Sequence, residues 1–219
     1  MMVAPTGHDA TRILLIRHGE TEWNKAQRIQ GQIDIALNDT GRQQALRLGQ
    51  ALAREAIAAI YASDLERAQV TAQAVADATG VALQTDARLR ERHYGSFQGL
   101  TYDEIQSQWP QQAKSWRERD PEFAPEGGES LLDLYARVLP TLDALARRHA
   151  GAQIVWVTHG GVIDVLYRAA THQDLSIRRS WDLSNTAINR LLWTPDGVTL
   201  VGWSDTRHLD AAVLDEASA

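Results

Sequence analysis

The chain contains the stretch Arg12-Ile13-Leu14-Leu15-Ile16-Arg17-His18-Gly19-Glu20-Thr21, in which a short apolar run ends in a polar cluster. The run is rich in isoleucine and leucine, which is typical of a parallel strand covered by helices on both faces. Ligand sites in open α/β sheets form outside the carboxyl ends of such strands. The sequence therefore predicts that His18 lies at this end of a central strand, beside Arg17, where a histidine can attack a phosphoryl group.

Strand-like and helix-like segments alternate along the rest of the chain. Further strands are expected at 57–62, 81–85 and 154–158, and a terminal hairpin is expected from 189–193 and 198–203. Between them, helices are expected after 38–41, with Thr40 and Gln43 at capping-box spacing, after Ser63-Asp64, after Ser130 with a kink at Pro140, and over 162–170. This alternation predicts an α/β fold, a three-layer sandwich with a mainly parallel central sheet flanked by helices.

The length of 219 residues suits one domain, and we expect residues 1–219 to form it. The regular pattern weakens after residue 88, where prolines interrupt it, and residues 94–126 are interpreted as a lid-like insertion within the domain. Residues 209–219 are expected to form a frayed tail.

Composition narrows the classes of function. The chain has no cysteine, which excludes disulfides and thiolate catalysis, and its net charge of −6 argues against a nucleic-acid partner. No apolar run reaches membrane-spanning length and no signal peptide is evident, so no membrane partner and a cytoplasmic location are expected.

Two further strand ends bring polar groups to the same edge of the predicted sheet. One strand ends at His159-Gly160-Gly161, and another leads into a helix whose first turn holds Arg67. The positive end of a helix already favours an anion, and the Arg67 guanidinium would add to it. The alternative is that Arg67 is a surface group paired with Asp64 or Glu66. Convergence of the strand ends favours a phosphate site.

Taken together, these stretches resemble the histidine phosphatase superfamily, also called phosphoglycerate mutase-like, in order and spacing over most of residues 12–193. The resemblance rests on Arg17-His18-Gly19-Glu20-Thr21-Glu22-Trp23-Asn24, Ser63-Asp64-Leu65-Glu66-Arg67-Ala68, Glu91, Gly127-Gly128-Glu129-Ser130 and Thr158-His159-Gly160-Gly161.

The resemblance implies a role for each matching residue. His18 would form a phosphohistidine while the Gly19 carbonyl holds its other ring nitrogen, and Glu91 would be the general acid and base. Catalytic or substrate contacts are likewise implied for the remaining site residues, which are Arg17, Arg67, His159, Asn24, Gln30, Gly31 and Gly160. Neither a metal nor a cofactor is expected, and nearby cations should keep His18 neutral.

Members of this family hydrolyse phosphomonoesters or move phosphate between hydroxyls of one sugar acid. Tyr102 stands where mutases have a lysine, and Trp116-Arg117-Glu118 replaces their paired arginines. We therefore predict a metal-independent phosphatase acting on a small phosphorylated metabolite. The alternatives are a cofactor-dependent phosphoglycerate mutase and a phosphate-recognition module without turnover. Two copies could pair as a homodimer through the edge strand of the terminal hairpin.

Overall fold

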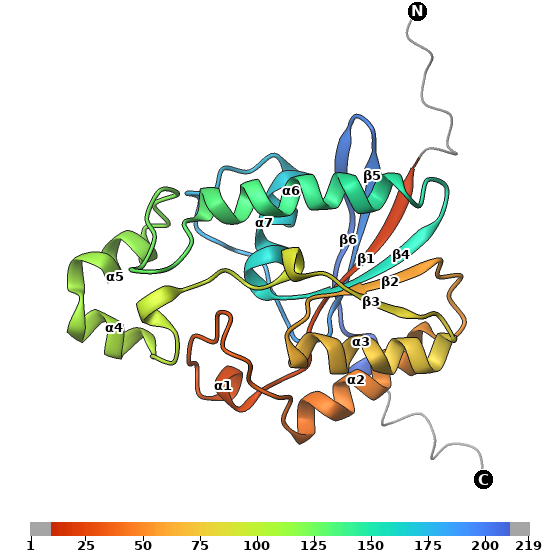
Figure 1. Cartoon of the computed structure of the whole chain (residues 1–219), viewed down its shortest axis with the longest axis horizontal. Coiled ribbons are helices and arrows are strands. Elements are labelled where there is room, and N and C mark those ends of the chain that lie inside the picture. The colour runs from red at the N-terminus through yellow and green to blue at the C-terminus, as the bar shows by residue number, and fades with distance from the viewer. Residues whose placement is uncertain (1–9, 211–219) are drawn as a thin grey trace, which may run out of the picture.

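A six-stranded sheet forms the middle layer of the computed structural model, which describes residues 10–210 (Figure 1). The spatial order is β3-β2-β4-β1-β5-β6. The first four strands run parallel to one another, β5 is antiparallel to β1, and β6 is antiparallel to β5. The strands are β1 (Thr11–Arg17), β2 (Ala59–Ala62), β3 (Leu83–Thr85), β4 (Gln153–Thr158), β5 (Ile188–Thr194) and β6 (Gly197–Asp205). The predicted α/β fold with a mainly parallel sheet is confirmed.

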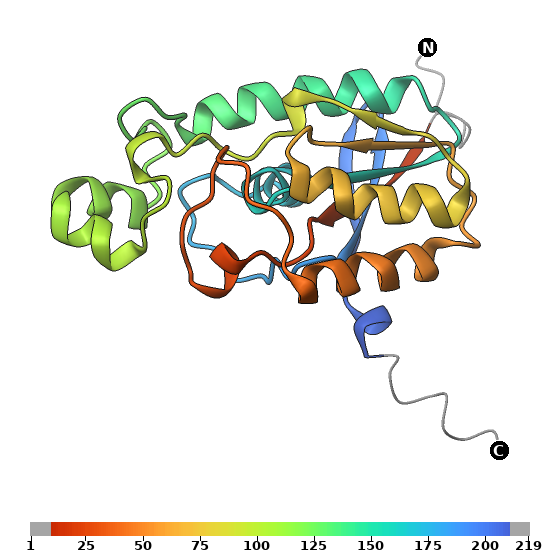
Figure 2. The same cartoon turned by 60° about the horizontal axis from the view of Figure 1, so that its bottom comes forward.

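Helices cover both faces of this sheet. Helices α2 (Asp39–Leu52) and α3 (Glu66–Thr79) pack on one face, and α6 (Leu131–Arg147) and α7 (Gly160–Thr171) on the other (Figure 2). Alternate side chains of β1 enter the two cores, because Ile13 and Leu15 join one cluster and Leu14 and Ile16 the other. Burial on both faces explains why the strand is a continuous apolar run.

The register of the sheet brings three strand ends to one edge. Arg17 of β1 pairs with Thr158 of β4, and Ala62 of β2 pairs with Val157 of β4. Because these strands are parallel, the residues that follow them, including His18 and His159, leave the sheet side by side.

Several element boundaries follow local signals. Ser130 caps α6 in a capping box with Asp133, and the helix continues through Pro140. The expected capping box of Thr40 and Gln43 is wrong, because Asn38 caps α2 by accepting from the Gly41 N–H. The strand and helix around residue 63 also begin later than predicted, at residues 59 and 66.

Residues 94–126 lie at one end of the molecule, at the left in Figure 1, and contain α4 (Tyr102–Gln108) and α5 (Pro110–Arg117). This segment has a small core of its own, built on Phe97, Ile105 and Ala113 and surrounded by aromatic side chains. Its core is therefore separate from the two main cores, and Arg119 links the segment to Asp164 of α7.

The described chain ends in a short 3-10 helix over residues 207–209. The Leu209 carbonyl accepts a hydrogen bond from Arg47 at 2.5 Å, so the beginning of the predicted tail is held against α2. Residues 211–219 of that tail lie outside the described residues. Across residues 10–210, no helix combines the length and apolar character needed to cross a membrane. β6 forms one edge of the sheet and β3 the other, and pairing of two copies through β6 stays a prediction.

Candidate active site

His18 lies at the carboxyl end of β1 and is 3% exposed. Its Nδ1 is 2.7 Å from the Gly19 carbonyl oxygen, the contact expected from the family resemblance. A carbonyl can only accept, so Nδ1 carries the proton and Nε2 keeps a free lone pair. The ring is therefore held in the tautomer that a nucleophile needs.

Burial lowers the pKa of His18 well below its usual value, and the nearby charges of Arg67 and Arg17 lower it further. The two cations act as expected from the sequence, but burial is the larger cause. The imidazole is consequently neutral at neutral pH.

The turn that carries His18 is fixed by two helices. The Gly19 N–H donates to Thr71 Oγ1 of α3 at 2.9 Å. On the other side, Gly41 of α2 approaches so closely that an added Cβ would lie 2.1 Å from the Glu20 carbonyl oxygen. Only a glycine fits at this contact, which places the start of α2 directly against the catalytic turn.

The turn leads into α1 (Glu22–Lys25), whose capping box positions Asn24. The Asn24 Oδ1 accepts from the Thr21 N–H at 3.1 Å, and Thr21 Oγ1 accepts from the Asn24 N–H at 3.1 Å. Glu20 accepts from Asn38 at 2.8 Å. Glu20 and Thr21 thus orient the turn.

Arg17 extends beside the nucleophile from the end of β1. Its Nη1 donates to the Leu183 carbonyl at 2.5 Å, while Nε is buried without a partner among the described residues. Burial lowers its pKa from the usual arginine value, but the side chain remains a cation at neutral pH.

Arg67, in the first turn of α3, is fully buried and donates to the carbonyls of Gly31 at 2.6 Å and Ile33 at 2.8 Å. Burial lowers its pKa to about 10, so it remains charged. The alternative surface pairing is wrong, because Asp64 pairs with Arg90 at 2.6 Å.

The free N–H groups expected at the start of α3 are also partly occupied. The Glu66 N–H donates to the Asp34 carboxylate at 2.8 Å. The Arg67 side chain, and not the helix end alone, therefore supplies positive charge to the site.

His159 follows β4 at the start of α7 and is fully buried, with its ring centroid 5.2 Å from that of His18. Burial lowers its pKa well below the usual value, and the charges on Arg67 and Arg17 add to this effect. Both ring nitrogens lack a partner within residues 10–210. Because buried polar atoms are generally paired, the ring is suited to bind an atom of a ligand.

Glu91 lies on the segment between β3 and α4 and lines a cavity together with His18. Its Oε1 accepts from the N–H groups of Arg92 at 2.8 Å and Gly161 at 3.0 Å, and Oε2 is 3.1 Å from the latter. An added Cβ at Gly161 would lie 2.3 Å from Oε1, so the glycine allows this approach. The arginines beside Glu91 bind elsewhere, because Arg90 pairs with Asp64 and Arg92 donates to two backbone carbonyls.

The Gly127-Gly128-Glu129-Ser130 motif supports Glu91 through Arg137, a residue that sequence reasoning missed. Arg137 pairs with Glu129 at 2.9 Å and donates to the carbonyls of Arg88, Arg90 and Glu91. Its position in α6 follows the helical pattern, but the sequence does not show which loop it reaches.

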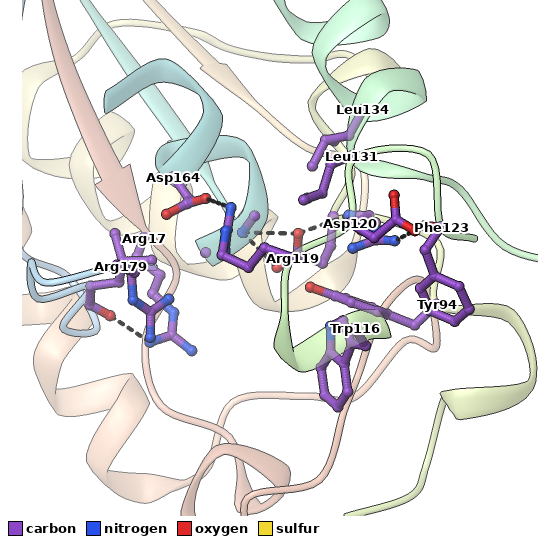
Figure 3. A pocket seen from close by; sticks show the side chains of 15 residues that line it. Arg17, Tyr94, Trp116, Arg119, Asp120, Phe123, Leu131, Leu134, Asp164 and Arg179 are labelled. Atoms are coloured by element: carbon purple, nitrogen blue, oxygen red, sulfur yellow. Dashed lines mark hydrogen bonds and ion pairs between the residues drawn. The ribbon is translucent and has the colours of Figure 1, made fainter. Parts of the chain in front are cut away.

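Two adjoining cavities share Arg17, Glu91, Tyr94 and Trp116. The inner cavity, about 160 Å³, is also lined by His18, Asn24, Gln30, Gly31 and Arg67. The outer cavity, about 290 Å³, is drawn in Figure 3 and includes Gly160. Glu91 thus lies between the inner cavity, which is beside the nucleophile, and the outer cavity, which has room for the rest of a ligand.

The outer cavity contains two cations that sequence reasoning missed, Arg119 and Arg179. Arg119 has a left-handed backbone, with φ of 58°, and extends to Asp164, to which it donates at 2.7 Å (Figure 3). It also donates to the Leu175 carbonyl at 2.9 Å. Burial, followed by the charge on Glu91, raises the pKa of Tyr94, whose hydroxyl therefore stays protonated. In residues 10–210, no group of three or more His, Cys, Asp or Glu side chains could hold a metal ion.

Comparisons with known proteins agree with this geometry. Residues 13–206 match the model of the histidine phosphatase superfamily, branch 1. The chain is 42% identical over 206 residues to phosphoglycerate mutase-like protein 4 of Arabidopsis thaliana, covering 92% of this chain and 88% of that protein. It is 36% identical over 207 residues to the metal-independent phosphoserine phosphatase of the same plant, covering 93% and 85%.

A similar solved structure is the mycobacterial glucosyl-3-phosphoglycerate phosphatase in complex with VO3. The TM-score is 0.80 at 33% identity, covering 89% of this chain and 99% of that one. The family model and the named relatives define a phosphatase of the histidine type. The chain belongs to the histidine phosphatase superfamily, in its branch 1.

Proposed function

We propose that the protein hydrolyses a small phosphomonoester, without a metal, through a phosphohistidine on His18. The observation that carries the proposal is the buried, neutral imidazole whose Nδ1 is bound to Gly19 while Nε2 is free. The Nε2 lone pair attacks phosphorus and the ester P–O bond breaks. Glu91, protonated at this stage, gives its proton to the leaving oxygen. Water then attacks phosphorus, Glu91 takes a proton from it, and the P–N bond breaks to release phosphate.

Charge in the transition state would be stabilised by Arg17, Arg67 and His159. Phosphoryl transfer depends mainly on positioning and electrostatic stabilisation. At an effective dielectric constant of about 20, one charge contact at about 4 Å contributes on the order of 4 kcal/mol. Each arginine is therefore expected to be important for the rate, and Asn24, Gln30, Gly31 and Gly160 would contact the substrate.

The direct test is to trap the intermediate. Protein mixed with a radiolabelled phosphomonoester and quenched in alkali should carry an acid-labile label, and His18→Ala should carry none. Hydrolysis of 4-nitrophenyl phosphate should continue in the presence of a chelator. An unlabelled wild-type chain that still hydrolyses substrate would contradict the mechanism, and binding of phosphate without any turnover would support the recognition module instead.

A leaving group with a carboxylate fits the outer cavity best. Two relatives are named as phosphatases of phosphoserine and of glucosyl-3-phosphoglycerate. Arg119 and Arg179 place positive charge in the outer cavity. We expect 3-phosphoglycerate to be hydrolysed faster than glycerol 3-phosphate, which differs in having CH2OH in place of the carboxylate. Arg119→Ala should reduce this ratio, whereas Arg178→Ala, on a residue outside the cavity lining, should preserve it. Equal rates for the two substrates would contradict this assignment.

Two observations support a phosphoglycerate mutase as the second candidate function. They are the two arginines of the outer cavity and the relative that is named phosphoglycerate mutase-like protein 4. Incubation with 3-phosphoglycerate distinguishes the two reactions. A phosphatase releases inorganic phosphate in proportion to substrate lost, whereas a mutase forms 2-phosphoglycerate and depends on added bisphosphoglycerate.

A further inference from the structure

We propose that Asn185, on the loop before β5, is a positioning residue for phosphoryl transfer. Its half-buried side-chain amide donates to the carbonyl oxygen of His18 at 2.7 Å and to Asn24 Oδ1 at 3.4 Å. The inference rests on the proposed role of His18 as the nucleophile. One side chain thus links the backbone of the nucleophile to a residue of the inner cavity.

The peptide group between His18 and Gly19 is clamped at both of its polar atoms. Asn185 holds the carbonyl of His18, and Thr71 Oγ1 of α3 accepts from the N–H of Gly19. The next carbonyl, that of Gly19, accepts from Nδ1 of the catalytic ring. Because the peptide group is planar, fixing both of its ends fixes the plane that leads into the Gly19 Cα, from which the Gly19 carbonyl extends to the imidazole.

The loop that carries Asn185 is itself attached to the same strand end. The Thr186 N–H donates to the Arg17 carbonyl at 2.9 Å, and the Leu183 carbonyl accepts from Arg17 Nη1 at 2.5 Å. Thr186 has φ of 56°, a region that β-branched residues rarely adopt. Such conformations persist where the surroundings determine them strongly, and they concentrate at functional sites. Residues 183–186 therefore hold Arg17, His18 and Asn24 in one arrangement.

Asn189, a few residues along the chain, provides a matched control. It is also an asparagine whose Nδ2 donates to a β1 carbonyl, that of Leu15, at 3.0 Å, and its Oδ1 accepts from the Ser204 N–H at 2.8 Å. It is 3% exposed, and like Asn185 it is not among the residues that line either cavity. Both asparagines tie the loop and hairpin to β1, but only Asn185 contacts the nucleophile.

The test compares Asn185→Ala, Asn185→Asp and Asn189→Ala in single-turnover experiments with 4-nitrophenyl phosphate. Asn185→Ala should slow phosphohistidine formation and kcat by roughly 10- to 100-fold, as expected for a small misplacement of a reacting group, while KM changes much less. Asn185→Asp, which removes the donor at constant size, should lose at least as much. Asn189→Ala should lower the melting temperature but leave kcat within about 2-fold of wild type once folded protein is measured.

Wild-type rates of phosphohistidine formation in Asn185→Ala and Asn185→Asp would overturn the inference, as would equal kcat losses in Asn185→Ala and Asn189→Ala. If the alanine variant does not fold, the isosteric aspartate variant gives the same comparison. Failure of the proposed function is seen separately, because in that case the wild-type protein itself carries no labelled histidine.

Discussion

Replacing Glu91 with glutamine tests the assignment of the general acid. The carboxylate accepts hydrogen bonds from the N–H groups of Gly161 and Arg92. None of the ion pairs among residues 10–210 includes it. Glutamine keeps one acceptor oxygen, so Glu91→Gln loses about one hydrogen bond, a destabilisation of about 0.5–1.5 kcal/mol.

The expected effect on catalysis is much larger than this loss of stability. A positioned general acid contributes roughly 10²- to 10⁴-fold, which corresponds to about 3–5 kcal/mol of transition-state stabilisation. The loss must depend on the leaving group, because an alkoxide requires a proton and a nitrophenolate is stable without one. We therefore expect kcat to fall by roughly 10²- to 10⁴-fold with an alkyl phosphate and by less than about 10-fold with 4-nitrophenyl phosphate.

The assay measures kcat and KM for 3-phosphoglycerate and 4-nitrophenyl phosphate with wild type, Glu91→Gln and Glu122→Gln. Glu122 is an exposed carboxylate of the lid-like segment, so its replacement controls for the loss of a negative charge. Equal losses on both substrates would refute proton donation by Glu91, and full activity of Glu91→Gln on the alkyl phosphate would refute any catalytic role.

Two further predictions concern stability. Burial lowers the pKa values of His18 and His159 in the folded protein, so below about pH 6.5 the unfolded chain binds protons that the folded chain does not. The free energy of unfolding should therefore fall with decreasing pH by up to about 1.4 kcal/mol per pH unit for each histidine. Measured by urea unfolding, it should depend less steeply on pH in His18→Asn than in wild type, and equal slopes for the two proteins would contradict this. Gly41→Ala places a Cβ 2.1 Å from the Glu20 carbonyl oxygen, so it should lower the free energy of unfolding in urea by about 1–3 kcal/mol and should also lower activity. An unchanged unfolding midpoint would contradict this, because it would show that α2 and the catalytic turn can move apart without cost.

The sequence predicted those parts of the molecule that depend on short-range pattern. Apolar runs and the polar residues that follow them are local features, so β1, β4 and the positions of His18 and His159 could be anticipated. That burial is the main cause of the lowered pKa values of the two histidines could not be anticipated, because it depends on how all the layers pack.

The residues missed by sequence reasoning reach the site from far along the chain. Arg119 and Asn185 lie in irregular segments without periodicity, and their partners at Asp164 and His18 are distant in sequence. Tyr102 and Arg117 were the positions from which we inferred that the cations of a mutase site are missing. Their side chains pack on each other outside both cavities. The positive charge in the outer cavity comes instead from positions that no pattern distinguishes.

The separate aromatic core of residues 94–126 has a consequence for how this enzyme type can diversify. Since Phe97, Ile105 and Ala113 pack with their own neighbours, changes around them leave the layers that support His18 untouched. Sequence changes in the segment can alter Tyr94, Trp116 and Arg119, which line the outer cavity, without entering the two cores on either side of β1, and this offers a route to new substrate preference.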